Sequence, residues 1–187
     1  MMAVKKELPE RKHPRLKNYD YKSGVYFITL CTSNREQILS TLCRVDPCGQ
    51  PRIKFSELGY ICHQTFPLIA ERYQVIFDCW IIMPDHIHCV LIIPESRSTA
   101  RVDPTQRFTI QARTDDYSEP TLFQVMGAYK SIITKQWRDL CNARNVSSGH
   151  LWQSSYYEHV IRNTSELYAA RKYISDNPNR WCVKYSI

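Results

Sequence analysis

The alternation of hydrophobic and polar positions along the chain predicts a mixed α and β fold. Runs rich in β-branched and aromatic residues, typical of strands, occupy positions 25–31, 74–83, 86–93 and 156–161. Apolar residues at roughly helical spacing predict helices over 56–70, 122–144 and 164–176. The polar segments between these elements are expected to be loops, including 34–44.

Prolines and polar caps set the expected boundaries of these elements. Pro84-Asp85 forms a tight turn that makes the second and third strands a hairpin. Pro67 is expected to kink or split the first helix. Asn163 is a good N-cap and Glu166 completes a capping box, whereas the Asn-Pro pair at 177–178 is expected to end the last helix.

The order of elements, β–α–ββ–α–β–α, predicts an α+β fold in which helices pack on one face of a small antiparallel sheet. The length of 187 residues fits a single domain spanning 1–187. Residues 95–120 are polar and charged, and we interpret them as an inserted mobile loop between the third strand and the long helix.

Composition narrows the classes of function. The 25 Lys and Arg against 18 Asp and Glu give a net charge of +7, which favours a polyanionic partner. The chain has no apolar run long enough for a membrane span, and its first residues lack the apolar segment of a secretion signal, so we expect a cytoplasmic protein with no membrane partner. The 8 cysteines form no Cys-x-x-Cys pair and are interpreted as reduced, structural thiols.

His86 and His88 are the first candidates for chemistry. Side chains alternate along a strand, so both imidazoles point to one face while Ile87 points to the other. Two adjacent imidazoles on a rigid strand are half of a divalent-metal site. From the residues alone, two polar side chains on a half-exposed strand face explain the pair equally well.

Tyr173 and Asn177 are the second candidates, because residues four apart share one face of a helix. An amide oxygen is an acceptable ligand for a hard metal, and a phenolic oxygen can be a covalent nucleophile. Taken singly, Tyr173 fits a core tyrosine and Asn177 fits a helix C-cap before proline.

Several blocks together extend these observations to a family. The stretches IIMPDHIHCVLIIP, YDYKSGVYFITLCTSNR, AYKSIIT, LWQSSYYEHVIRN and KYISDNPNRW resemble, in this order over residues of about 11 to 181, the REP-associated tyrosine transposases. These are single-strand DNA transposases with a histidine–hydrophobe–histidine motif and one catalytic tyrosine. The segment 95–120 has no counterpart in the resemblance.

The resemblance implies a ferredoxin-like, RRM-like fold and a catalytic site. His86 and His88 would bind Mg²⁺ or Mn²⁺, and the family pattern Tyr-x-x-x-Gln falls on Tyr173 and Asn177. Asparagine in place of glutamine shortens the third metal ligand. Asp85 stands where the family often has asparagine, and we assign it no ligand role.

The implied activity is that of a metal-dependent endonuclease and strand transferase acting on single-stranded DNA. The implied mechanism is attack by Tyr173 on a phosphodiester, giving a 5′-phosphotyrosine linkage that a later 3′-hydroxyl reverses. The implied partners are single-stranded DNA with REP-like hairpins, for a nucleoid-associated monomer or homodimer.

DNA contacts are expected from basic and aromatic residues that follow phosphates or cradle unpaired bases. These are Arg11, Lys12, Arg15, Tyr19, Tyr21, Lys130, Lys135, Arg138 and Arg162. Tyr157 and His159 share one face of the fourth strand and are interpreted as packing or DNA-contact residues.

Two other functions stay open from the residues. The first is a non-catalytic module that binds nucleic-acid hairpins on the same fold. The second is an unrelated metallohydrolase that holds zinc with His86, His88 and His159.

Overall fold

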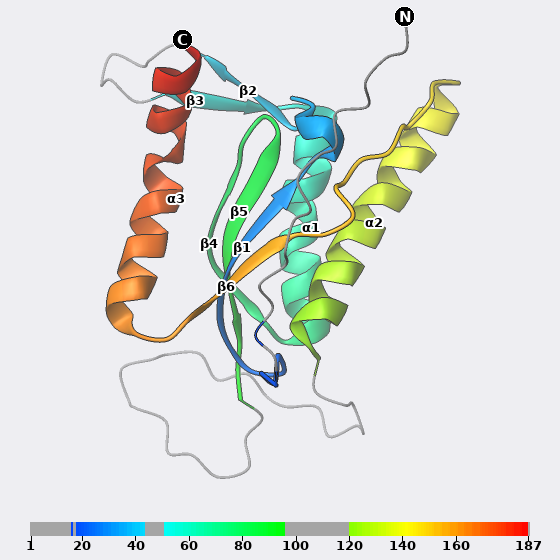
Figure 1. The fold of residues 1–187 in the computed structure, drawn as a ribbon. Helices are drawn as coiled ribbons and strands as arrows, with labels where there is room; N and C mark the ends of the chain where they lie inside the picture. The colour runs from blue at the N-terminus through cyan, green and yellow to red at the C-terminus, as the bar shows by residue number, and fades with distance from the viewer. Residues whose placement is uncertain (1–15, 17, 44–50, 96–119, 187) are drawn as a thin grey trace, which may run out of the picture.

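A four-stranded antiparallel sheet forms the centre of the computed structural model, which describes residues 16, 18–43, 51–95 and 120–186 (Figure 1). The strands lie in the order β4–β5–β1–β6. Their bounds are Gly24–Cys31 for β1, Ile76–Ile82 for β4, His86–Ile93 for β5 and Tyr157–Ile161 for β6. With α1 (Glu57–Tyr73) and α2 (Leu122–Ala143), this is the ferredoxin-like arrangement, so the predicted α+β class is confirmed.

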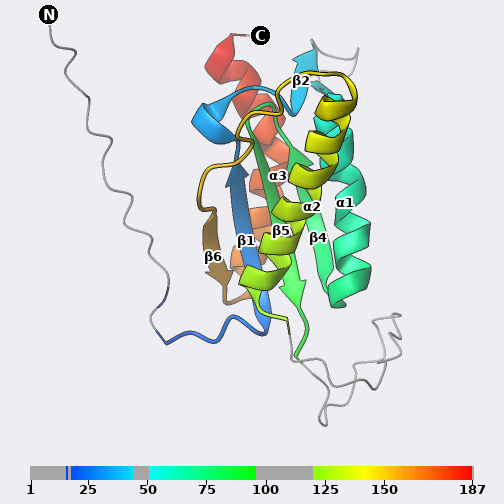
Figure 2. The same ribbon diagram turned by 90° about the vertical axis from the view of Figure 1, so that its right-hand side faces the viewer.

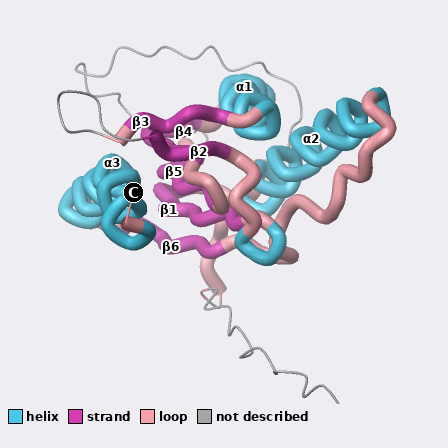
Figure 3. The backbone as a smooth tube through the Cα atoms, turned by 90° about the horizontal axis from the view of Figure 1, so that it is seen from above, coloured by secondary structure: helices cyan, strands magenta, loops and turns pink. Residues whose placement is uncertain are grey.

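The helices cover both faces of the sheet, which corrects the prediction that they pack on one. Figure 2 shows α1 and α2 side by side over one face, where they enclose the larger core with Ile87, Cys89 and Leu91 of β5. The last helix, α3 (Thr164–Tyr185), lies across the opposite face, as the view from above shows (Figure 3). There Ile174 packs against Val90 and Ile161 in a smaller cluster. A strand flanked on both sides is apolar along nearly its whole length, as the sequence of β5 is.

The predicted end of the last helix is wrong, because α3 continues through Pro178 to Tyr185. A proline inside a helix removes one backbone hydrogen bond. Burial of Asn177, Pro178 and Trp181 on the face toward the sheet holds the helix together across that gap. Pro67 likewise lies inside α1, which is one helix and is not split.

A second, two-stranded sheet was not predicted. Its strands β2 (Ser40–Cys43) and β3 (Arg52–Phe55) pair above the main sheet in Figure 1. The link from β1 to β2 contains a short 3-10 turn, η1 (Ser33–Arg35). Gly59 lets α1 approach this region, because a Cβ at that position would lie 2.1 Å from the carbonyl oxygen of Leu39.

Other sequence expectations have mixed outcomes. The seven cysteines in the described ranges are free, and four of them are buried. None of the helices described is long and apolar enough to cross a membrane. The predicted insertion at 95–120 lies almost entirely outside the described residues.

Two polar contacts support α3, one within its own first turn and one to the sheet. At its start, the Asn163 side chain accepts a hydrogen bond from the Glu166 amide at 2.9 Å, which confirms the predicted N-cap. Along its length, Arg171 donates two hydrogen bonds to Asp78 of β4, at 2.7 and 2.6 Å. Only the second of these contacts joins the helix to another element.

Replacing Asn163 with alanine should lower the free energy of unfolding by about 1 kcal/mol, because an orphan amide of the first turn loses its acceptor. Urea denaturation measures this change. Asn163→Asp keeps an acceptor oxygen and serves as the matched control. Equal stability of the alanine variant and the wild type would show that the cap contributes nothing.

Arg171→Gln should reduce stability at neutral pH by up to about 1 kcal/mol, because the pair is bidentate but partly exposed. The hydrogen bond from Arg171 lowers the pKa of Asp78 below its ordinary value of 3.8. The stabilisation is thus present above pH 3.8 and is lost as the pH falls through the lower, folded pKa.

The stability difference between Arg171→Gln and the wild type should therefore shrink in acid, as followed by urea denaturation across pH. Lys172→Gln removes a neighbouring exposed cation of the same helix and is the control. A difference that stays constant with pH would contradict a role for the Asp78 carboxylate.

Candidate functional site

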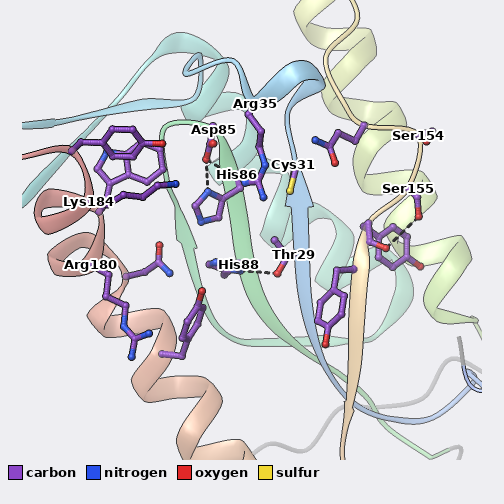
Figure 4. A pocket seen from close by; sticks show the side chains of 17 residues that line it. Thr29, Cys31, Arg35, Asp85, His86, His88, Ser154, Ser155, Arg180 and Lys184 are labelled. Carbon is purple, nitrogen blue, oxygen red and sulfur yellow. Dashed lines mark hydrogen bonds and ion pairs between the residues drawn. The ribbon is translucent and has the colours of Figure 1, made fainter. Parts of the chain in front are cut away.

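A pocket between the sheet and α3 brings together the four predicted catalytic residues. His86 and His88 come from β5 (Figure 4). Tyr173 and Asn177 come from α3. The cavity measures about 940 Å³. Residues distant in the sequence thus converge on one concave surface, which is the usual setting of a catalytic or binding site.

The two histidines lie side by side on β5, and their ring centroids are 4.5 Å apart. Each Nδ1 has a partner: Asp85 Oδ1 lies 2.5 Å from that of His86, and Thr29 Oγ1 lies 2.9 Å from that of His88. When Nδ1–H donates to these oxygens, the lone pair is on Nε2 of both rings. In metal sites, a hydrogen bond from the second ring nitrogen of this kind orients the histidine that binds the metal.

Burial and the neighbouring His86 lower the pKa of His88 to about 3. Its imidazole is therefore neutral at pH 7, as a metal ligand must be. Burial alone would raise the pKa of Asp85, but the hydrogen bond to His86 and the charges of His86, Arg35 and Lys184 together lower it. Asp85 is thus an ionised carboxylate that is only 6% exposed.

Tyr173 lies directly beside His88. Its ring centroid is 5.2 Å from that of His88 and 5.8 Å from that of Phe27. The guanidinium of Arg180, two turns further along α3, lies 5.0 Å from the centre of the tyrosine ring. The side chain is 37% exposed, so its hydroxyl is accessible to a substrate in the pocket.

Asn177 follows Tyr173 by one helical turn and is 6% exposed. Its side chain lines the pocket, where an amide oxygen can serve as a ligand. The role of Asn177 as the third metal ligand stays a prediction.

Two imidazoles with oriented rings and one amide oxygen form a donor set that fits a divalent ion such as Mg²⁺ or Mn²⁺. No group of three or more His, Cys, Asp or Glu side chains is placed to hold a metal within the described ranges. A metal held here would therefore depend on Asn177 and on oxygens from substrate or water.

The zinc alternative lacks its third ligand. His159 is half-exposed on β6, and its Nε2 lies 3.4 Å from Glu166 Oε2 at the start of α3. It does not line the pocket with His86 and His88. Tyr157, by contrast, is 51% exposed and lines the pocket from β6.

Sequence reasoning missed three cations around the pocket, which are Arg35, Arg180 and Lys184. The Arg35 Nη1 atom lies 3.6 Å from Asp85 Oδ1. Arg35 and Asn34 both have a positive φ, which is uncommon for residues other than glycine. The predicted helix ended at 176, so Arg180 and Lys184 fell outside it. They follow Tyr173 by seven and eleven residues, and this spacing places all three on one face of the longer helix.

The predicted DNA-binding residues are dispersed. Arg11, Lys12 and Arg15 lie outside the described residues. Tyr21 is 7% exposed in the core, stacked on Tyr26, so it packs the fold and leaves little surface for a base. Tyr19 packs edge-on against Tyr21 at the edge of the core.

The predicted basic residues of α2 lie together, away from the histidines. Lys130, Lys135 and Arg138 line a second cavity of about 630 Å³ between α2 and residues 149–154. Arg162 is exposed where β6 leads into α3 and lines neither cavity.

Comparison with known proteins gives one relative of the same family and a more distant one. No protein-family model matches the chain. An uncharacterized protein of Haemophilus influenzae is 30% identical over 175 residues, which cover 91% of this chain and 89% of that protein. A REP-associated tyrosine transposase of Escherichia coli is 24% identical over 162 residues, covering 87% of this chain and 70% of the transposase.

The fold has a counterpart among solved structures. The structure of a REP-associated tyrosine transposase bound to a REP hairpin superposes with a TM-score of 0.51 and 21% identity, over 89% of this chain and 73% of that one. The chain therefore belongs to the same family as the uncharacterized Haemophilus influenzae protein and is a distant relative of the REP-associated tyrosine transposases.

Proposed function

We propose that the protein is a metal-dependent endonuclease and strand transferase for single-stranded DNA, with Tyr173 as its nucleophile. The observation that carries this proposal is the contact between Tyr173 of α3 and His88 of β5, with Asn177 one turn further into the same pocket. The similarity to a tyrosine transposase supports the same reaction class.

In the proposed reaction, the Tyr173 oxygen attacks a DNA phosphorus atom in line with the leaving 3′-oxygen. The tyrosine–phosphorus bond forms and the bond to the 3′-oxygen breaks. The phenol proton is replaced by the phosphorus, and one proton ends on the 3′-hydroxyl product. The other DNA strand segment stays attached as a 5′-phosphotyrosine, and attack by a 3′-hydroxyl reverses the step and joins strands.

His86, His88 and Asn177 would hold a divalent ion, which when bound supplies positive charge to the phosphate oxygens. Asp85 and Thr29 keep the two imidazoles in orientation through Nδ1. This orientation precedes substrate binding and needs no rearrangement during the reaction, which is how positioned polar groups lower a barrier.

The cations around the pocket would bind the DNA backbone on either side of the reacting phosphate. Arg180 and Lys184 come from α3, and Arg35 comes from the turn after β1. Arg180 also lies over the Tyr173 ring, where its charge favours developing negative charge on the phenolic oxygen. Phosphate contacts of this kind position DNA without reading its sequence.

The proposed substrate is single-stranded DNA that carries a hairpin, since a structural neighbour was solved bound to a REP hairpin. DNA of this kind is found at the nucleoid, so we propose a cytoplasmic, nucleoid-associated protein. From the same family resemblance, we propose that the protein acts as a monomer or as a homodimer.

Tyr173→Phe should reduce the covalent protein–DNA adduct by about 10³-fold or more, because the nucleophilic oxygen is removed. The measurement uses a labelled library of single-stranded DNA hairpins with Mn²⁺, followed by denaturing electrophoresis. Tyr157→Phe is the matched control, because Tyr157 lines the same pocket and is more exposed. It should keep the adduct.

Two outcomes would contradict this assignment. An adduct that persists in Tyr173→Phe and disappears in Tyr157→Phe would move the nucleophile to β6. Hairpin binding by the wild type without any adduct would favour a non-catalytic hairpin-binding module.

Asn177→Ala should raise the Mn²⁺ concentration needed for half-maximal adduct formation by roughly 10- to 100-fold, because one ligand of the ion is lost. His159→Ala should leave that concentration unchanged, since His159 contacts Glu166 and is outside the pocket. Titrating Mn²⁺ into each variant after chelation measures both effects. The reverse pattern would favour a metal site built with His159.

A further inference from the structure

The second cavity adjoins the proposed catalytic pocket. Gln153 and Ser154 line both, so this segment forms a wall between the two. Along the opposite wall, α2 contributes one face with residues spaced by three and four, which are Gly127, Lys130, Ser131, Thr134, Lys135 and Arg138. We call this second cavity the α2 cleft.

The α2 cleft is basic. Lys130, Lys135 and Arg138 line it, and none of its described lining residues is acidic. Lys130 Nζ donates to the carbonyl of Gln153 at 2.9 Å, which fixes one cation at the junction of the two cavities. Lys135 pairs with exposed Asp139 outside the cleft, at 2.7 Å. The cleft therefore matches a polyanion and not a neutral ligand.

Gly127 has no packing reason within the described fold. Glycine inside a helix is less favourable than alanine by about 1 kcal/mol, yet a Cβ at position 127 would meet nothing within 4 Å. Gly127 therefore leaves open space in the wall of the α2 cleft, which a large side chain at this position would fill.

We propose that the α2 cleft binds the sugar–phosphate backbone of single-stranded DNA as it continues from the catalytic pocket. This inference rests on the proposed function for the direction of the strand, but binding in the cleft does not require cleavage. A basic groove that follows the backbone is the usual design for sequence-tolerant binding of single strands.

The test compares affinities for oligothymidylates of about 4 and about 16 nucleotides, lengths that bracket typical single-strand sites. In the wild type, the longer probe should bind more tightly than the shorter one, as measured by fluorescence anisotropy, and we call this increase in affinity the gain. Gly127→Phe fills the cleft and should abolish this gain. Gly127→Ala adds one methyl group in open space and should keep the gain, which makes it the matched control.

A second variant does not alter the helix backbone. Lys135→Ala with Arg138→Ala should also abolish the gain, and it should reduce the slope of log affinity against log salt by about 0.7 for each phosphate that the two cations neutralise in the wild type. Circular dichroism melting shows whether each variant is folded. A full length-dependent gain in both folded variants, or no gain in the wild type, would overturn the proposal.

Adduct formation separates this inference from the proposed function. Gly127→Phe should still form the Tyr173 adduct on short hairpin substrates, because it leaves the catalytic pocket intact. A length-dependent gain that the cleft variants abolish, with no adduct in any protein, would uphold the cleft and reject the enzyme. An adduct together with an unchanged gain in the cleft variants would uphold the enzyme and reject the cleft.

Discussion

Burial of β5 on both faces is the constraint on which the site depends. Ile87, Cys89 and Leu91 enter the larger core, so the alternation of the strand directs His86 and His88 to the other face. Two imidazoles in a covered position need polar partners, and Asp85 and Thr29 supply them. The same packing that folds the sheet therefore fixes the orientation of both rings before any ligand arrives.

Helix α3 closes the site with a small set of buried residues, which are Ile174, Asn177, Pro178 and Trp181. Ile174 is its main contact with the smaller cluster, and the pair between Arg171 and Asp78 ties it to the edge strand. Stability is rarely uniform across a fold, and elements with few buried contacts are the first to open. Tyr173, the proposed nucleophile, lies at a defined position beside His88 on this helix.

Local patterns predicted much of this arrangement and failed where tertiary contacts dominate. Strand alternation and helical spacing were enough to pair His86 with His88 and Tyr173 with Asn177, because both rules act within one element. The end of α3 was missed because burial of Trp181 outweighs the local effect of Pro178. Arg35 was missed because its place depends on a turn with positive φ that no periodicity signals.

Thr32 links the two cavities through the backbone. It is fully buried at the end of β1, its Oγ1 donates to the Asp85 carbonyl at 2.9 Å, and its backbone bridges Trp152. On either side of it, Ser33 N donates to the Leu151 carbonyl and Gln153 N donates to the Cys31 carbonyl. The turn before the histidines and the wall shared by both cavities are thus held by the same short stretch of chain. A shift of that stretch would therefore move both the turn that carries Asp85 and the wall shared by the two cavities.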